Sequence, residues 1–222
     1  HRPPPQRPPA AASELPQNGH EVLFDAFTWT RRSTSTRIHA IAFINAGSDS
    51  LCVRIIDEKQ PGENLKQVTA GNLKETFATR WYPWMGRPRV MRYDPHGSAI
   101  SDEFREWAEA QGILCPPCAA DAHWQIGKVE RVIEACKEAL DVFDEQASAD
   151  VPTEVLIGMQ LAARNDLVKL DGFSPLQRYA GRSPVGPGGN VLGEPLNIPL
   201  INSGMVDGSF GRDANLRRLA RI

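Results

Sequence analysis

Apolar and polar residues near the start of the chain alternate in the way that predicts β-strands. Three runs rich in β-branched and aromatic residues, with short polar breaks between them, cover residues 21–29 (EVLFDAFTW), 37–45 (RIHAIAFIN) and 50–56 (SLCVRII). Runs of this length and composition predict strands. Because the connections are short, we expect the three strands to form an antiparallel meander.

The apolar period then lengthens to that of helices, with short strand-like runs in between. The predicted elements are a helix over residues 63–84, a strand over 89–94, a helix over 101–112 and a short strand over 113–115. Pro83 is expected to end the first of these helices, because proline has no backbone N–H to continue the hydrogen-bond pattern. Ser101 and Gly112 suit the two ends of the second helix.

A long helix is predicted over roughly residues 125–146. Its apolar stripe consists of Val129, Val132, Ile133, Cys136, Leu140 and Phe143. Glu130 lies at the edge of this stripe, and Lys137 falls within about 20° of Glu130 on the same helix face. Two further helices are expected, one over about residues 152–168 and a short one opened by Ser174 and Pro175.

The predicted order of elements, β-β-β-α-β-α-β-α-α, indicates an α/β fold. A meander followed by alternating strands and helices implies a mixed sheet with helices on its faces. With 222 residues, of which 41% are hydrophobic and 23% charged, the chain can bury a core of this kind. No apolar run approaches the roughly 20 residues of a membrane span.

Composition and charge narrow the classes of function. A net charge of −2 and a pI near 6.2 leave no overall electrostatic footprint for nucleic acid, although a local patch with metal ions can still hold DNA. Four cysteines are too few for a disulfide scaffold, so we expect a reducing compartment. Cys115 and Cys118 (CPPC) fit a zinc or redox site poorly, because His123 is the one further ligand nearby in sequence and prolines stand where a helix should begin.

Three carboxylates follow the predicted elements in a way that indicates a metal site. Asp25 lies on the first strand, Asp94 ends the fourth, and Glu130 lies early in the long helix. Adjacent parallel strands bring the two aspartates together, and a helix packed across the strand ends can supply the glutamate. Clustered carboxylates repel one another unless cations neutralise them, and Mg²⁺ or Mn²⁺ prefers such oxygen ligands. Two ions about 4 Å apart are the general device for phosphoryl displacement.

These residues carry a resemblance to a known family. The chain resembles the catalytic core of retroviral and retrotransposon integrases, which are ribonuclease-H-like polynucleotidyl transferases. The matching segments are Asp25 in LFDAFTW, Asp94 in MRYDPHG and Glu130 in HWQIGKVER, with the family's spacing of 35 residues between the last two carboxylates. FREWAEAQGI and GFSPLQRYAGRSP also resemble family segments. The resemblance covers about residues 20–182, and the Asp94–Glu130 pair is its most specific part.

The chain departs from the family pattern at a few positions. Gly97 lies three residues after Asp94, where many members have the glycine two residues on. Asn45 ends the second strand, where an aspartate is frequent. The family has basic residues four and seven positions after the glutamate, and this chain has Glu134 at the first of them and Lys137 at the second. Glu134 is expected to weaken contact with DNA phosphates.

The resemblance implies a ribonuclease-H-like sheet of three antiparallel and two parallel strands, with helices on both faces. It implies a retrotransposon integrase core, part of a polyprotein, in which Asp25, Asp94 and Glu130 bind two Mg²⁺ or Mn²⁺ ions. The expected reactions are cleavage near the 3′ end of the element DNA and attack of the freed 3′ hydroxyl on target DNA. The expected partners are both DNAs and further copies of the chain, with no membrane, and the expected place of action is the nucleus.

Candidate DNA contacts and domain boundaries complete this interpretation. The candidate DNA-binding residues are Lys128, Lys137, His123 and Gln125. Residues 1–19 are expected to form a Pro-rich linker, 20–182 the catalytic core, and 183–222 an extension that is rich in glycine and proline and then basic.

Two alternatives share the same carboxylates. A catalytically decayed or domesticated core would keep the fold and serve as a nucleic-acid-binding or assembly module, which the acidic balance and Glu134 favour. A ribonuclease or resolvase on the same fold would cut without strand transfer. Taken singly, Asp94 could cap a turn, Glu130 could be a solvated helix residue, and His123 could be an ordinary loop histidine.

Overall fold

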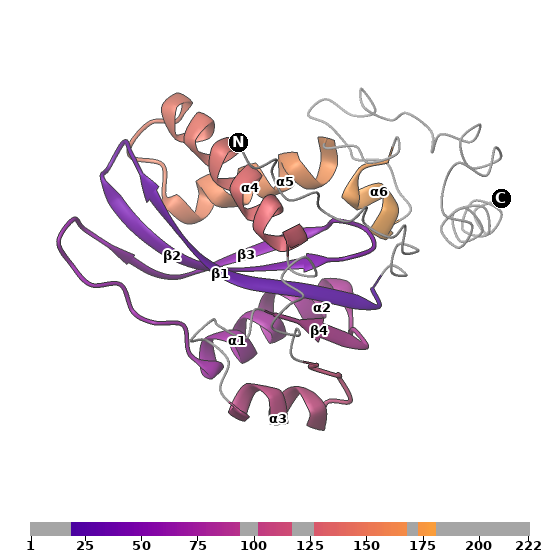
Figure 1. The fold of residues 1–222 in the computed structure, drawn as a ribbon. Helices are drawn as coiled ribbons and strands as arrows, with labels where there is room; N and C mark the ends of the chain where they lie inside the picture. The colour runs from indigo at the N-terminus through magenta and orange to yellow at the C-terminus, as the bar shows by residue number, and fades with distance from the viewer. Residues whose placement is uncertain (1–18, 94–101, 117–126, 168–172, 181–222) are drawn as a thin grey trace, which may run out of the picture.

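A four-stranded mixed sheet forms the centre of the fold (Figure 1). The computed structural model describes residues 19–93, 102–116, 127–167 and 173–180. The elements, in chain order, are β1 (Glu21–Arg31), β2 (Thr36–Asn45), β3 (Leu51–Lys59), α1 (Ala70–Thr76), the π-helical turn η1 (Phe77–Trp81), α2 (Tyr82–Met85), β4 (Val90–Arg92), α3 (Asp102–Ala110), α4 (Gly127–Gln146), α5 (Thr153–Leu167) and α6 (Pro175–Ala180). No helix among the described residues has the length and hydrophobicity needed to span a membrane.

The strands run in the spatial order β3-β2-β1-β4. The first three pair antiparallel, and β4 pairs parallel with β1, which confirms the meander and the mixed sheet. The strand predicted over residues 113–115 is reduced to one parallel bridge between Val90 and Leu114. Pro116 follows at once and has no N–H to donate to a ladder, which limits pairing there.

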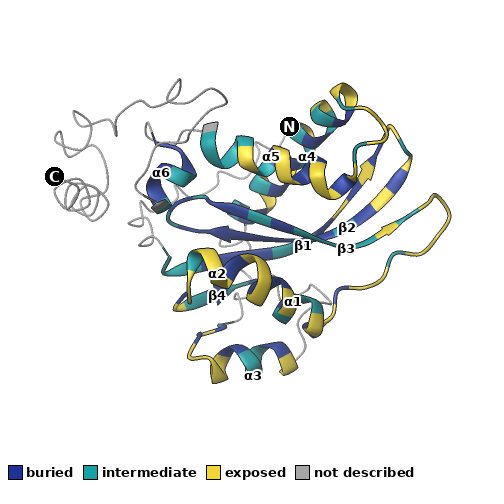
Figure 2. Cartoon of the chain, turned by 180° about the vertical axis from the view of Figure 1, so that it is seen from behind, coloured by how far each residue is buried: buried dark blue, intermediate teal, exposed yellow. Residues whose placement is uncertain are grey.

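Alternate residues of β1 face two separate hydrophobic clusters, one on each side of the sheet. Leu23, Phe27 and Trp29 pack with α4 and α5, and Val22 and Phe24 pack with α1, η1 and α3. Figure 1 shows these helices on opposite sides of the sheet, and Figure 2 shows the strands buried between them. Because successive side chains of a strand point to opposite faces, β1 contributes to the core on both faces of the sheet. Helices cover both faces, as predicted.

The helical segment before β4 differs from the prediction at its start and at Pro83. Helix begins at Ala70 instead of residue 63, because Thr69 caps it by accepting a hydrogen bond from the Asn72 N–H at 3.2 Å. The backbone of Lys66 is held elsewhere, with its N–H donating to Asp57 at 2.8 Å and its carbonyl oxygen 2.7 Å from the ring of His39. Pro83 does not end the helix but lies in the first turn of α2, where a backbone N–H has no acceptor within that helix.

The other helices lie close to their predicted limits. Gly112, with φ of 74°, follows α3 and confirms the predicted stop. In α4 the predicted stripe is buried at Val129, Ile133, Cys136 and Leu140, with Val132 and Phe143 packed partly buried beside it. Ser174 and Gln177 form a reciprocal cap at the start of α6, with hydrogen bonds of 3.2 and 2.8 Å.

The two tryptophans of the segment before β4 differ in burial. Trp84 is 74% exposed, whereas Trp81 is buried.

A buried ion pair joins the β1–β2 hairpin to the far end of α4. Arg31 and Asp144 lie 2.9 Å apart, and their side chains are only 3% and 2% exposed. The Arg31 guanidinium also donates to the Val151 carbonyl at 2.7 Å, and Ser33 donates to Asp144 from its N–H at 2.9 Å. Burial opposes ionisation of the Asp144 carboxyl, but the hydrogen bonds from Ser33 and the Arg31 charge outweigh it and hold its pKa below the usual value.

Candidate functional site

Asp25 lies in the middle of β1 on the side of the sheet that α4 and α5 cover. Its neighbours at alternate positions, Leu23 and Phe27, belong to the hydrophobic cluster that contains Val129 of α4. The side chain is half-buried, and its Oδ1 accepts a hydrogen bond from the Ala26 N–H at 2.7 Å. A local hydrogen bond of this kind orients the carboxylate at a position where β1 is paired with β2, Asp25 lying opposite Ala42.

Glu130 lies in the first turn of α4 and is exposed. The preceding residue, Val129, is buried in the cluster beneath α4, so the backbone that carries Glu130 is held firmly on the sheet. The helix that carries Glu130 therefore covers the side of the sheet on which Asp25 lies.

Several predicted site residues lie outside the described residues, namely Asp94, His123 and Gln125. Tyr93, the residue before Asp94, is described: it is buried, and its ring lies 5.6 Å from that of Phe24, the residue before Asp25. Among the described residues, no group of three His, Cys, Asp or Glu side chains could hold a metal ion. Since Asp94 is not in that set, this observation does not bear on the predicted trio.

Cys115, the first cysteine of CPPC, is buried, and Cys118 lies outside the described residues. Burial raises the pKa of the Cys115 thiol to about 11, so the group is protonated at neutral pH. A protonated, buried thiol is a poor nucleophile.

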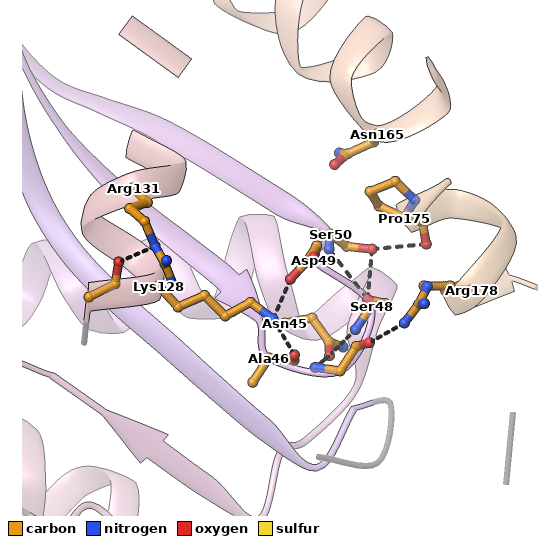
Figure 3. Close-up of polar contacts among 12 residues, drawn as sticks. Asn45, Ala46, Ser48, Asp49, Ser50, Lys128, Arg131, Asn165, Pro175 and Arg178 are labelled. Atoms are coloured by element: carbon orange, nitrogen blue, oxygen red, sulfur yellow. Dashed lines mark hydrogen bonds and ion pairs between the residues drawn. The ribbon is translucent and has the colours of Figure 1, made fainter. Parts of the chain in front are cut away.

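The two lysines predicted to contact DNA have protein partners in the structure. The Lys137 ammonium lies 2.7 Å from Glu134 on the same helix. The Lys128 ammonium donates to the Ala46 carbonyl oxygen at 2.6 Å and forms an ion pair with the Asp49 carboxylate. Lys128 thus reaches from α4 to the turn between β2 and β3, as Figure 3 shows.

This β2–β3 turn, residues 45–50, was not among the predicted site elements. Asn45 is buried at its start, and its side-chain oxygen accepts hydrogen bonds from the Gly47 and Ser48 N–H groups at 3.0 and 3.2 Å. Arg178 of α6 donates to the Gly47 carbonyl at 3.3 Å (Figure 3). The local signal in the sequence was the turn composition AGSD, but it does not reveal the helices that dock on the turn.

Comparison with known proteins shows a likeness of structure without a close relative in sequence. No protein family model matches the chain, and no curated protein matches it. The magnesium complex of the HTLV-2 integrase catalytic core in its dimeric form is similar over 73% of this chain and 97% of its own, at 17% identity and a TM-score of 0.57. The BIV integrase catalytic core is similar over 73% of this chain and 95% of its own, at 13% identity and a TM-score of 0.56.

A chain from a larger assembly is also similar in structure. A chain of the simian T-cell lymphotropic virus intasome, solved with the PP2A regulatory subunit B56 gamma, is similar over 79% of this chain at 18% identity, with a TM-score of 0.62. This chain covers 58% of that one. The order of strands, the helices on both faces and these likenesses lead to one conclusion: the protein has the ribonuclease-H-like fold of retroviral integrase catalytic cores.

Proposed function

We propose that the chain is the catalytic core of a retrotransposon-type integrase, which cleaves near the 3′ end of element DNA and transfers that end to target DNA. The observation that carries the proposal is the position of Asp25 and Glu130 on the same side of the sheet, one on β1 and one in the first turn of α4. Two carboxylates in this relationship are the parts that metal-dependent phosphoryl transfer needs from a protein.

In this proposal Asp94 is the third carboxylate. The parallel pairing of β1 and β4 supports it, because Leu23 is paired with Arg92 and the rings of Phe24 and Tyr93 are in contact. The next residues of the two strands in sequence are Asp25 and Asp94.

The donor set suits a hard divalent cation. Carboxylate oxygens on strand and helix match Mg²⁺ or Mn²⁺, and the HTLV-2 core of similar fold was solved in complex with magnesium. When bound, such ions supply charge neutralisation at a phosphate and activation of the attacking water or hydroxyl. The protein's own part is to orient Asp25 through the Ala26 N–H and to hold Glu130 on a helix fixed by Val129.

The proposed interface with DNA surrounds the carboxylates. Lys137 lies on the same helix as Glu130, and Gln125 and His123 precede that helix in sequence. The proposal includes assembly with further copies of the chain, since the HTLV-2 core was solved in dimeric and trimeric forms. It also includes action in the nucleus, a Pro-rich linker over 1–19, a core over 20–182 and an extension over 183–222.

One observation favours a second candidate, a decayed core that binds nucleic acid or assembles without cutting. Lys137, the one basic residue that this chain keeps of the two expected after Glu130, is paired with Glu134. An acidic partner lowers the attraction of this surface for phosphate.

The deciding experiment is metal-dependent cleavage and strand transfer on paired DNA duplexes, with Mg²⁺ and with Mn²⁺. Wild type is expected to perform both reactions. Glu130→Gln is expected to lose them and keep its melting temperature, because the side chain is exposed and the amide has nearly the same volume. Glu109→Gln, an exposed change on α3, is the matched control and is expected to react as wild type does. If wild type binds DNA and never cuts with either metal, the decayed core is the right description.

A further inference from the structure

We propose that Lys128 is a positioning residue, which fixes the first turn of α4 on the sheet so that Glu130 faces Asp25, instead of a DNA contact. This inference rests on the proposed function. Its first support is the location of the Lys128 ammonium, 2.6 Å from the Ala46 carbonyl oxygen and paired with Asp49. Lys128 precedes Glu130 by two residues, so the anchored side chain and the proposed metal ligand belong to the same helical turn.

The turn that Lys128 contacts is a rigid support. Its backbone is closed by hydrogen bonds of 2.9 Å from Asn45 N to Ser50 O and from Asp49 N to Asn45 O. Arg164 of α5 donates to the Asp49 carbonyl oxygen at 2.7 Å. Asp49 itself adopts a left-handed conformation, with φ of 61°, which aspartate accepts more readily than most other non-glycine residues. An ion pair to such a turn fixes a helix better than an ion pair to a mobile loop.

The same turn also contacts β1, which in turn contacts β4, and these are the two strands of the proposed site. Ala46, whose carbonyl accepts from Lys128, donates its N–H to the Glu21 carbonyl oxygen at 2.9 Å. Glu21 begins β1, and its carboxylate pairs with Arg92 of β4 at 2.6 Å. Three consecutive contacts therefore connect α4, β1 and β4. The residues that make these contacts are close in sequence to the proposed ligands. Lys128 lies two residues before Glu130, Glu21 four before Asp25, and Arg92 two before Asp94.

A metal site built from carboxylates on separate elements requires contacts that hold those elements together. Ligands on separate elements bind a cation tightly only if the elements are held at one spacing, and supporting contacts of this kind are typically worth 10- to 100-fold in metal affinity or activity. The ammonium of Lys128 is held by Ala46 and Asp49 of the same chain, so the residue contributes through Glu130 and not by touching phosphate.

The test compares three variants of the 222-residue chain. Lys128→Met removes the charge and keeps an unbranched helix-forming side chain. Asp49→Asn removes the partner's charge with a residue that tolerates the left-handed conformation. Lys74→Met is the matched control, because Lys74 pairs with Glu103 on the other side of the sheet and is 27% exposed, as Lys128 is. The measurements are Mn²⁺ affinity without DNA, metal-dependent cleavage, and the salt dependence of binding to a labelled duplex, all well below the melting temperatures.

For a positioning residue, Lys128→Met and Asp49→Asn both lower Mn²⁺ affinity and cleavage by about 10- to 100-fold. The double variant is then no worse than Lys128→Met alone, because Lys128→Met already removes the ion pair that Asp49→Asn removes, together with the hydrogen bond to Ala46. Lys74→Met behaves as wild type, and the salt slope of DNA binding is the same in all variants.

The opposite pattern overturns the inference. If Lys128 contacts phosphate, Lys128→Met reduces the salt slope by about one, while Asp49→Asn frees the ammonium and tightens DNA binding. Unchanged Mn²⁺ affinity in Lys128→Met, with an active wild type, also rejects the positioning role and leaves the proposed function standing. A wild type without Mn²⁺ binding and without cleavage rejects the proposed function, and the role of Lys128 with it.

Discussion

Lys137 and Glu134 form an ion pair on α4, with 2.7 Å between the ammonium nitrogen and the Glu134 Oε1. They are three residues apart and therefore neighbours on one face of the helix. Glu134 is exposed and Lys137 is partly covered. In the proposed interface, the lysine nearest to Glu130 on this face thus carries an acidic partner that competes with DNA phosphate.

Removing that partner should strengthen DNA binding. Glu134→Gln is expected to raise affinity for a labelled duplex and to steepen its dependence on salt by up to about one unit of log–log slope, because Lys137 becomes available to a phosphate. Glu109→Gln on α3 changes the net charge equally and serves as control. Equal changes of slope in both variants would assign the effect to net charge and contradict a local role for Lys137.

Binding of metal should stabilise the folded protein. If Asp25 is a ligand, Mn²⁺ raises the melting temperature by mass action, worth about 2.7 kcal/mol at a hundred times the dissociation constant. Asp25→Asn should lose most of this gain and melt no lower than wild type in the absence of metal, since clustered carboxylates repel. Calorimetry with and without Mn²⁺ checks both, with Asp102→Asn, a change at an exposed position of α3, as control. A full metal response in Asp25→Asn would locate the ions elsewhere.

The ion pair of Arg31 and Asp144 should make stability depend on pH. The pKa of Asp144 is lowered in the folded state, so the carboxylate stabilises the fold at pH values above the ordinary Asp pKa of about 3.9. This contribution is lost as the pH falls from there through the lowered pKa. Denaturant unfolding at a series of pH values is expected to show wild type and Asp144→Asn converging on the acid side.

At neutral pH the two proteins should differ strongly. Asp144→Asn leaves the buried Arg31 charge without its counter-ion, which typically costs about 3–5 kcal/mol in the free energy of unfolding. Glu145→Gln is the control, because its contact with Arg32 is exposed and 3.8 Å long, and it should change the free energy by less than about 0.5 kcal/mol. A loss in Asp144→Asn as small as in the control would show that the pair contributes little.

The core beneath α4 should be sensitive to cavities. Leu140 is fully buried between α4 and the sheet, so Leu140→Ala is expected to lower the free energy of unfolding by about 2–5 kcal/mol. Val142→Ala lies two residues on and is 51% exposed, and it should cost less than about 1 kcal/mol. Both changes are measured from the midpoints of denaturant unfolding, provided that the dependence of the free energy of unfolding on denaturant concentration is the same in all proteins.

The meander and the long helix could be predicted from the sequence because their side-chain periods are clear. β1 alternates between two clusters, and four residues of the α4 stripe are buried as expected. The start of α1 was missed because Thr69 and Asn72 cap the helix in a pattern that usually has Glu or Gln at the second position. Pro83 was misread because proline ends a helix in its interior but is accepted in a first turn.

The candidate site was predictable only in part. Asp25 was expected on the first strand and Glu130 early in the long helix, and the structure has them on β1 and in the first turn of α4. The partner of Lys128 could not be foreseen, because Ala46 is 82 positions away and no local pattern encodes the contact. The position of Lys128 close to Glu130 in sequence predicted a DNA contact, and the structure adds the contacts of its ammonium with Ala46 and Asp49.

The buried guanidinium of Arg31 also limits which parts of the chain can fold on their own. Its partners Asp144 and Val151 lie 113 and 120 positions further along the chain. Hairpins form quickly, but contacts over such separations require large loops to close first. Until α4 has folded, the Arg31 end of the hairpin lacks these partners, and the guanidinium stays in water. We therefore expect the strands to be unstable as a separate fragment, and the sheet to become stable together with the helices that cover it.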